Sequence, residues 1–231
     1  MFHPKGPTFF ELVRQGLAST DRGYDLLASK FELTPFRTPE AVLEVAARAT
    51  GKADLALDLA CGTGAALRAF RPGCRALVGI DRSQGMLSEA RRLSAGPRVS
   101  WVRGDALDLP FSARFDLVSC FGAFGHILEA DEPRLVAEIH RVLRPGGRFV
   151  FATAERSSLR PLGVLLARGF NAAMHLRNAL WKPEFVMYYL TFLLPRAATL
   201  LTAQGFEVEV TPGAFPEPYQ RLRLVVATKR A

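Results

Sequence analysis

Short apolar runs alternate with helical patterns along this chain from residue 54 onward. Runs of six or seven residues rich in Leu, Val, Ile and Phe predict β-strands, and apolar residues three or four apart between them predict helices. This alternation is typical of βαβ units, which place successive strands parallel in one sheet, so we expect an α/β fold. The predicted strands cover residues 54–60, 75–81, 99–104, 115–121, 148–153, 206–211 and 222–228.

The helices predicted between these strands have recognisable ends. Ser83 is a suitable N-cap for a helix over 83–93, because its side-chain oxygen can accept from a free backbone N–H of the first turn. The sequence Arg144-Pro145-Gly146-Gly147 is a strong stop after a helix over 132–143. Further helices are predicted over 64–70 and 195–204.

Two segments lie outside the alternating pattern. Residues 1–50 contain helical stretches over 9–17, 21–31 and 39–50, which we expect to form an N-terminal cap. Residues 155–190 form an insertion before the last helix, and we expect an amphipathic cap over the sheet edge or the mouth of the active site. On a helical wheel its polar side holds Arg160, Arg168, Asn171, His175 and Asn178, and its apolar side holds Leu162, Leu165, Leu166, Phe170, Ala173, Leu176 and Leu180.

The first predicted strand runs into a glycine-rich turn, Asp58-Leu59-Ala60-Cys61-Gly62-Thr63-Gly64, which leads into a helix. Glycines at 62 and 64 allow a sharp turn and a close approach of a ligand to main-chain N–H groups. Nicotinamide-binding proteins have a similar turn, but Leu67 stands at the third glycine of their GxGxxG fingerprint. Asp58, inside the strand, would repel a pyrophosphate and attract a ligand with a cationic end.

Two more carboxylates end the next two predicted strands. Asp81 is positioned to accept two hydrogen bonds from a ribose diol, and Asp105 to accept from an exocyclic amine such as that of adenine. Ligands bind outside the carboxyl ends of parallel strands, so these groups are expected to meet at one edge of the sheet. Three acids and a glycine turn, without a phosphate-binding lysine, predict a pocket for a positively charged nucleoside that carries no phosphate.

Five motifs occur in a fixed order over residues 54–154: DLACGTG, VGID, GDALDLPF, FDLVSCFGAFGHI and HRVLRPGGRFVF. In order and spacing they resemble the class I S-adenosylmethionine-dependent methyltransferases, and most nearly the small-molecule subgroup that includes quinone-biosynthesis enzymes. The resemblance implies a Rossmann-like, doubly wound seven-stranded sheet, mostly parallel with the last strand antiparallel. It also implies S-adenosyl-L-methionine as cofactor, with S-adenosyl-L-homocysteine as its product.

The resemblance assigns cofactor contacts by motif position. Asp58, Gly62 and Gly64 would hold the methionine moiety, and Asp81 the ribose hydroxyls. Met86 would pack on the adenine, with core packing as the alternative, while the alternative for Asp58 is to anchor its own loop. The complete set of expected cofactor-binding residues is Asp58, Ala60, Cys61, Gly62, Gly64, Asp81, Arg82, Met86, Asp105, Ala106, Phe121 and Gly122, of which Phe121 and Gly122 would line the sulfonium.

Methyl transfer from a sulfonium is an in-line displacement that depends mainly on alignment and exclusion of water. A base is needed only where the acceptor arrives protonated. His126, after the fourth predicted strand, is the best-placed candidate for this base, although we weigh a purely structural role at the start of a helix more heavily. Tyr24, Tyr188 and Tyr189 are candidate walls of the acceptor site, with ordinary packing as the alternative.

Three hypotheses remain for the methyl acceptor. The leading one is a small, fairly apolar molecule, because 17 phenylalanines and the insertion supply apolar surface. The second is RNA or tRNA, favoured by the basic C-terminal third, and it predicts one patch formed by Arg160, Arg168, Arg221 and Arg223. The third is a lipid or quinone reached by a peripheral membrane enzyme, with residues 159–181 as its interfacial helix.

Length and composition limit the number of domains and the kinds of partner. At 231 residues, 49% of them hydrophobic, the chain is long enough for one domain, with a cap (1–50), a core (54–154), an insertion (155–190) and C-terminal elements (191–231). The net charge of +8 is compatible with an anionic partner, but richness in Arg, Ala, Gly and Pro is simply explained by a GC-rich genome. Three scattered cysteines predict neither disulfides nor a metal site. Without a signal peptide or a spanning apolar run, a cytoplasmic location is expected; the oligomeric state is not predicted.

Overall fold

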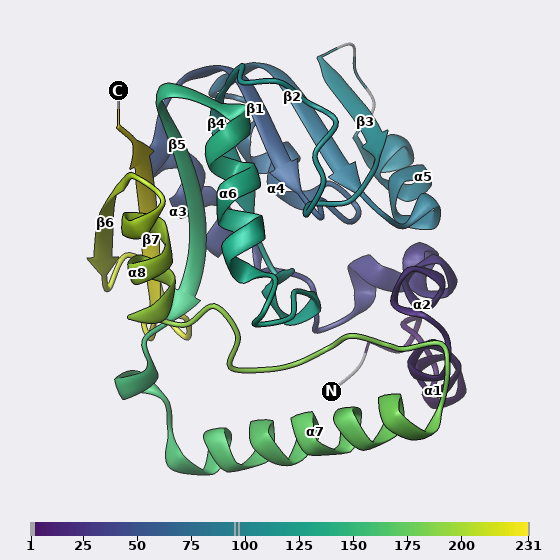
Figure 1. Ribbon diagram of the computed structural model, residues 1–231. Coiled ribbons are helices and arrows are strands. Elements are labelled where there is room, and N and C mark those ends of the chain that lie inside the picture. The colour runs from purple at the N-terminus through teal and green to yellow at the C-terminus, as the bar shows by residue number, and fades with distance from the viewer. Residues whose placement is uncertain (1–2, 95, 97, 231) are drawn as a thin grey trace.

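The computed structural model describes residues 3–94, 96 and 98–230. Seven strands form one sheet in the order β3-β2-β1-β4-β5-β7-β6 (Figure 1). The pairs from β3 to β5 are parallel, whereas β7 is antiparallel to both β5 and β6, which confirms the expected doubly wound α/β fold. The strands are β1 (Ala53–Leu59), β2 (Cys74–Asp81), β3 (Val99–Arg103), β4 (Phe115–Cys120), β5 (Leu143–Ala154), β6 (Phe206–Pro212) and β7 (Leu222–Lys229).

Helices cover both faces of the sheet. On one face α3, α4 and α5 bury Val42, Leu67 and Leu87 against it, and on the other α6 and α8 bury Leu135 and Leu201. The α-helices are α1 (Phe9–Leu17), α2 (Thr20–Leu27), α3 (Glu40–Thr50), α4 (Ala65–Phe70), α5 (Gln84–Leu93), α6 (Glu132–Val142), α7 (Pro161–Leu180) and α8 (Arg196–Ala203). Three short 3-10 helices are η1 (Ala28–Leu33), η2 (Phe124–His126) and η3 (Arg156–Ser158).

Most element ends lie within one residue of those predicted from the sequence. Ser83 caps α5 as expected, since its Oγ accepts from the backbone N of Met86 at 3.1 Å. The helix predicted over 21–31 is shorter, because after Leu27 the chain tightens into η1.

The fifth strand begins earlier than the predicted residue 148. Leu143 already pairs with Phe115 of β4, so β5 starts directly after α6 ends at Val142. The register then shifts before Arg148 pairs with Leu117, and Gly146 adopts a positive φ of 74° within this irregular part. The Pro-Gly-Gly sequence therefore ends the helix as predicted, but it belongs to a distorted start of the strand rather than to a separate loop.

The N-terminal helices lie over the carboxyl end of the sheet. Asp25 of α2 fixes them there, because its Oδ1 accepts from the Ser83 hydroxyl at 2.7 Å and from the Gly85 backbone N at 2.8 Å. Both donors belong to the start of α5. Substitution of Gly85 would disturb this contact, since a Cβ there would lie 2.9 Å from the Cα of Asp25.

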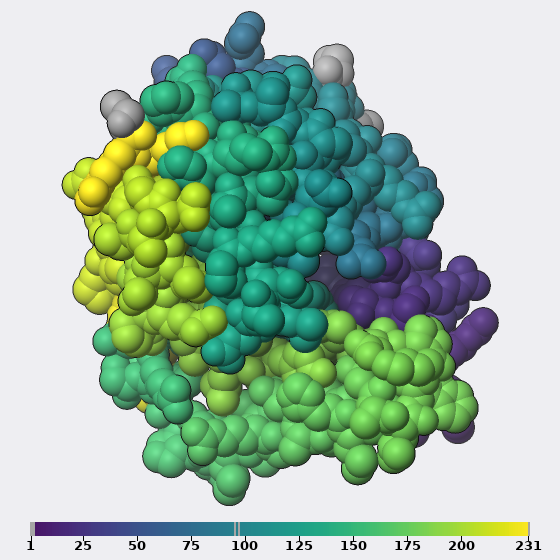
Figure 2. Space-filling view, viewed as in Figure 1, coloured from purple at the N-terminus to yellow at the C-terminus, as the bar shows by residue number. Residues whose placement is uncertain are grey.

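The insertion forms α7 and then an irregular stretch up to Leu194. α7 lies apart from the sheet as a ridge along the lower side of the molecule (Figures 1 and 2). Its orientation differs from that of an amphipathic cap, because Asn171 and Asn178 face the protein while the leucines of the apolar side are exposed. Arg168 and His175, which the helical wheel grouped with the asparagines, are exposed as well. The hydrogen bonds of these two asparagines, rather than the apolar side of the helix, therefore set the orientation of α7.

Candidate functional site

A cavity of about 730 Å³ opens at the carboxyl ends of β1, β2 and β4. Its walls come from the glycine turn after β1, the chain after β2, β3 and β4, the N-terminal helices, and residues 184–191. The volume is in the range of small-molecule sites. The edge of the sheet where the sequence predicted a ligand is therefore the place where the structure is hollow.

The structure brings together nearly all of the predicted site residues. Gly64 is the one that does not line the cavity. Those that do are Asp58, Ala60, Cys61, Gly62, Asp81, Arg82, Met86, Asp105, Ala106, Phe121, Gly122 and His126.

The two glycines of the turn serve different purposes. Gly62 has a φ of 52°, and no atom lies within 4 Å of the position that a Cβ would take, so its surface is open. Gly64 has a φ of 80°, and a Cβ there would lie 2.6 Å from Cη2 of Trp101. Gly62 thus leaves room for a ligand, whereas Gly64 is needed for the turn and for packing against β3.

Asp81 holds the glycine turn in place. Its Oδ2 accepts from the Gly62 backbone N at 2.8 Å, and its Oδ1 accepts from the Ser83 backbone N at 2.8 Å. Burial raises the pKa of this carboxyl above its usual value, while the two backbone N–H groups act in the opposite direction. Each carboxylate oxygen can accept a second hydrogen bond, so Asp81 retains capacity for a ligand.

Asp58 is buried deep in the cavity wall. Its Oδ1 accepts from the Ser119 hydroxyl at 2.7 Å, which links β1 to β4. Burial raises its pKa from 3.8 to about 7, and the nearby charge of Asp81 acts in the same direction. A cation placed beside Asp58 would favour the ionised form, so this carboxyl can respond to the charge of a bound ligand.

Arg82 connects the sheet to the N-terminal helices. It forms ion pairs with Asp21 of α2 at 3.0 Å and with Asp105 after β3 at 3.3 Å. The other oxygen of Asp105 accepts from the Leu107 backbone N at 2.9 Å. Asp21 was not predicted as a site residue, because nothing in the sequence relates it to an arginine 61 positions later.

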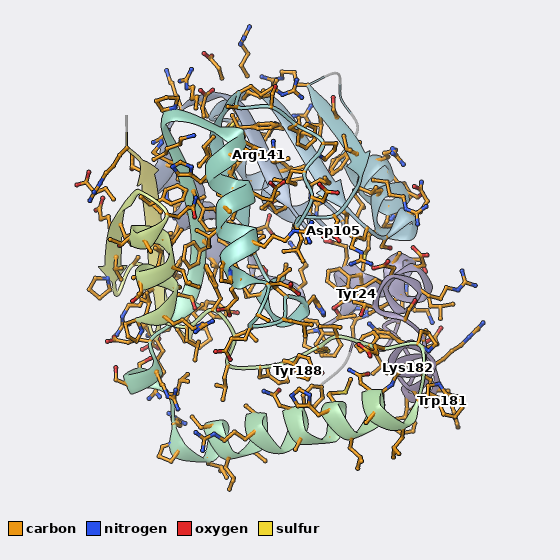
Figure 3. All side chains as sticks on the ribbon, in the orientation of Figure 1. Tyr24, Asp105, Arg141, Trp181, Lys182 and Tyr188 are labelled. Carbon is orange, nitrogen blue, oxygen red and sulfur yellow. The ribbon has the colours of Figure 1, made fainter. Side chains whose placement is uncertain are left out.

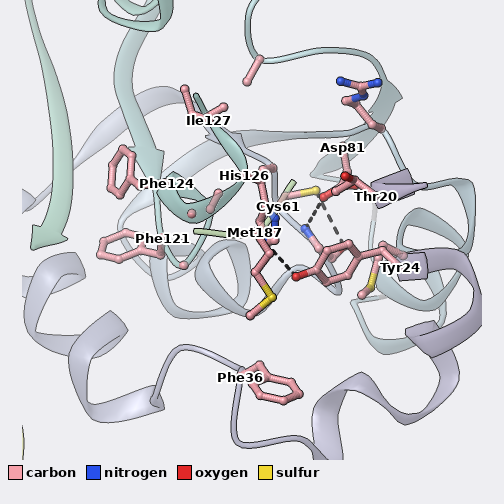
Figure 4. A pocket seen from close by; sticks show the side chains of 18 of the residues that line it. Thr20, Tyr24, Phe36, Cys61, Asp81, Phe121, Phe124, His126, Ile127 and Met187 are labelled. Carbon is pink, nitrogen blue, oxygen red and sulfur yellow. Dashed lines mark hydrogen bonds between the residues drawn. The ribbon is translucent and has the colours of Figure 1, made fainter. Parts of the chain in front are cut away.

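Tyr24 and His126 form the polar pair of the cavity (Figure 4). The Tyr24 hydroxyl lies 2.7 Å from Nε2 of His126, and Nδ1 lies 2.6 Å from the Val186 carbonyl oxygen. Since a carbonyl only accepts, Nδ1 carries the proton, and Nε2 accepts from the Tyr24 hydroxyl. Burial lowers the pKa of His126, which keeps the imidazole neutral and able to take a proton at Nε2.

The rest of the wall near this pair is mainly apolar. It includes Phe31, Phe36, Phe121 and Met187. Tyr188 lies between the cavity and α7 (Figure 3), and its hydroxyl accepts from Asn178 Nδ2 at 3.2 Å. Phe31, Phe36 and Met187 were missed in the sequence, because isolated apolar residues in a cap or an irregular segment carry no motif.

Known proteins resemble this chain in sequence. Residues 56–147 match the family described as "Methyltransferase domain". A 2-phytyl-1,4-naphtoquinone methyltransferase of Synechococcus elongatus is 33% identical over 184 residues, which are 75% of this chain and 70% of that protein. A demethylmenaquinone methyltransferase of Deinococcus radiodurans is 31% identical over 234 residues, covering 99% of this chain and 82% of that protein.

Solved structures share the fold. A putative O-methyltransferase from Nostoc punctiforme has a TM-score of 0.65 at 16% identity, over 90% of this chain and 60% of that one. The magnesium protoporphyrin IX methyltransferase of Synechocystis, solved with bound SAH, has a TM-score of 0.57 at 16% identity, over 82% of this chain and 80% of that one. With its glycine turn, its strand order and these relatives, the chain belongs to the class I S-adenosylmethionine-dependent methyltransferases, in the group that includes quinone methyltransferases.

Proposed function

We propose that this methyltransferase acts on a fairly apolar aromatic acceptor with a hydroxyl group, of the reduced-quinone kind. The observation that carries the proposal is the Tyr24–His126 pair, a proton-accepting group set in a mainly apolar part of the cavity wall. The relatives named for naphthoquinone and menaquinone substrates support the same acceptor class. We further propose that residues 1–50 and the insertion cap one methyltransferase domain that encloses this acceptor.

The part of the cavity next to the carboxyl ends of β1 and β2 suits S-adenosyl-L-methionine. When bound, this cofactor supplies a methyl group on a positively charged sulfur. Asp81 and Gly62 would hold its ribose and methionine parts, and Asp58 would face its cationic amino-acid end. Met86 and Asp105 would bind the adenine. Two features suit such a ligand. Gly62 has an open surface, and a cation bound beside the buried Asp58 would lower the raised pKa of that carboxyl.

Tyr24 is placed to receive the proton that the acceptor hydroxyl loses. The Tyr24 oxygen accepts this proton as its own proton passes to Nε2 of His126, which leaves a phenolate on the acceptor, a neutral tyrosine and an imidazolium. The Val186 carbonyl, which accepts from Nδ1, stabilises the imidazolium. His126 would thus act through Tyr24 rather than on the acceptor directly.

The apolar wall has a second effect on the reaction. Phe31, Phe36 and Phe121 line the cavity and limit the water around the reacting groups. A phenolate in such surroundings is poorly solvated and therefore more nucleophilic. Alignment and exclusion of water supply most of the acceleration expected for an in-line methyl transfer.

The structure favours a small acceptor over RNA. Two of the four arginines of the predicted basic patch are engaged within the chain. Arg223 pairs with Glu155 at 3.3 Å, and Arg221 donates to the Ser158 carbonyl at 3.2 Å. The ion pair offsets the charge of Arg223, and the carbonyl contact holds the Arg221 side chain within the chain, so fewer free guanidinium groups remain for a phosphate backbone.

The direct test uses purified protein, methyl-labelled S-adenosyl-L-methionine and either a reduced naphthoquinone with a prenyl tail or bulk tRNA. We expect label in the organic phase with the quinol and none in the nuclease-sensitive fraction. Tyr24→Phe should strongly reduce this labelling, whereas Tyr219→Phe, a matched change outside the cavity, should not. Labelling of tRNA alone would refute the proposed acceptor class.

A further inference from the structure

Two neighbouring helices each present apolar side chains to the outside. On α7 the exposed side chains are Leu162, Leu165, Leu166, Leu176 and Leu180, each between 61% and 76% exposed. On α1 they are Phe9, Phe10, Val13 and Leu17, with Phe10 82% exposed. α1 lies beside the C-terminal end of α7 (Figure 1), where Arg177 donates to the Ala18 carbonyl at 3.1 Å. We call these nine side chains, together with Trp181, the outer apolar face.

The inner side of α7 explains why this face points outward. Asn171 donates to the Tyr189 carbonyl at 2.9 Å and accepts from the Tyr189 backbone N at 2.8 Å. Asn178 forms the same kind of pair with Phe185, at 3.1 and 3.0 Å. These paired bonds tie α7 to the segment 184–191, so the helix is oriented by polar contacts and its leucines remain without cover. An exposed apolar area of this kind marks an interaction site rather than ordinary surface.

The charges of α7 itself are all positive, whereas α1 carries Glu11 beside its arginine and Lys182 is paired with Glu184. Residues 156–183 contain five basic residues and no Asp or Glu. Arg160, the N-cap residue of α7, and Arg168 within the helix are exposed, and neither has an ion-pair partner among residues 3–94, 96 and 98–230. Within those same residues, no helix is long and apolar enough to cross a membrane. An interfacial helix on an anionic bilayer has exposed leucines and aromatic residues flanked by arginines, and it does not cross the membrane. The outer apolar face has these features.

We propose that the outer apolar face docks on the surface of a bilayer that contains anionic phospholipid. In this position α7 lies in the lipid interface, and the segment 184–191 lies directly behind it. Residues Val186 to Leu190 of that segment line the cavity on their other side. An acceptor dissolved in the bilayer would therefore enter the site past this segment. This entry route rests on the proposed function, whereas the docking of the outer apolar face on the bilayer does not.

Vesicle sedimentation tests the docking without any substrate. We expect the protein to sediment with vesicles that contain phosphatidylglycerol and much less with pure phosphatidylcholine, because about 1 kcal/mol per arginine corresponds to about fivefold in partition. The double variant Leu165→Glu, Leu166→Glu should lower partition at least about tenfold. Val210→Glu, a matched change at an exposed apolar position on the edge strand β6, should leave it unchanged.

Further outcomes separate this inference from the proposed function. Methylation of a tail-less, water-soluble quinol should be equal in the wild type and the double variant, while methylation of a vesicle-bound quinol should fall with partition. A wild type that binds vesicles but methylates neither quinol would refute the acceptor class and leave the docking intact. Failure of the wild type to sediment with anionic vesicles, or a stable dimer that the double variant abolishes, would overturn the docking.

Discussion

The buried carboxyl of Asp58 makes the stability of this protein depend on pH in a specific way. Its folded-state pKa of about 7 lies above the ordinary value of 3.8. The unfolded chain therefore loses this proton first as pH rises, which stabilises the unfolded state relative to the folded one. Asp58→Asn removes the titration and keeps the shape, since the amide oxygen can still accept from the Ser119 hydroxyl.

The size of the effect follows from the two pKa values. With 3.8 in the unfolded chain and about 7 in the folded protein, Asp58 lowers the free energy of unfolding by about 2 kcal/mol at pH 5. At pH 8 the same calculation gives about 4 kcal/mol. The advantage of Asp58→Asn over the wild type should therefore grow by about 2 to 3 kcal/mol between these two pH values.

Urea unfolding of the ligand-free protein at pH 5 and pH 8 measures this difference. Asp54→Asn is the matched control, because Asp54 lies on the same strand but its side chain is 67% exposed and only loosely paired with Arg75 at 3.5 Å. We expect its difference from the wild type to stay within about 0.5 kcal/mol at both pH values. If the Asp58→Asn advantage is the same at pH 5 and pH 8, Asp58 ionises normally and the argument from burial is wrong.

Four further substitutions test the site. Gly64→Ala should lower the free energy of unfolding by about 1–3 kcal/mol, measured by chemical denaturation, because its Cβ would lie 2.6 Å from Trp101. Gly62→Ala should mainly weaken cofactor binding, measured by calorimetry, because its Cβ would point into open space. Asp81→Asn should weaken S-adenosyl-L-homocysteine binding about tenfold or more, through loss of a charged acceptor, and an unchanged affinity would exclude a ribose contact. Tyr24→Phe should reduce turnover on a quinol about 100-fold at unchanged S-adenosyl-L-homocysteine affinity, and turnover within twofold of the wild type would remove Tyr24 from proton transfer.

Local patterns were sufficient for the sheet and for much of its binding edge. The period and length of the apolar runs predicted six of the seven strands to within one residue. The turn from Asp58 to Gly64 and the acids Asp81 and Asp105 were identified from their places at strand ends, because in a parallel sheet the end of a strand is itself a spatial position. The fifth strand was predicted too short, since its distorted start at Leu143 depends on pairing with Phe115, a partner that the sequence does not reveal.

The sequence by itself determined the order of strands and helices, because short-range periodicity specifies it. It also determined which acids and glycines lie at the carboxyl edge of the sheet, because turn residues mark the strand ends. Only the tertiary structure decided the acceptor side. The Tyr24–His126 pair joins residues 102 positions apart, and Val186 lies 60 positions beyond His126. Likewise, the apolar face of α7 points outward because Asn171 and Asn178 found partners in a later segment. Such contacts depend on how remote segments pack against one another, and no local pattern of residues encodes that choice.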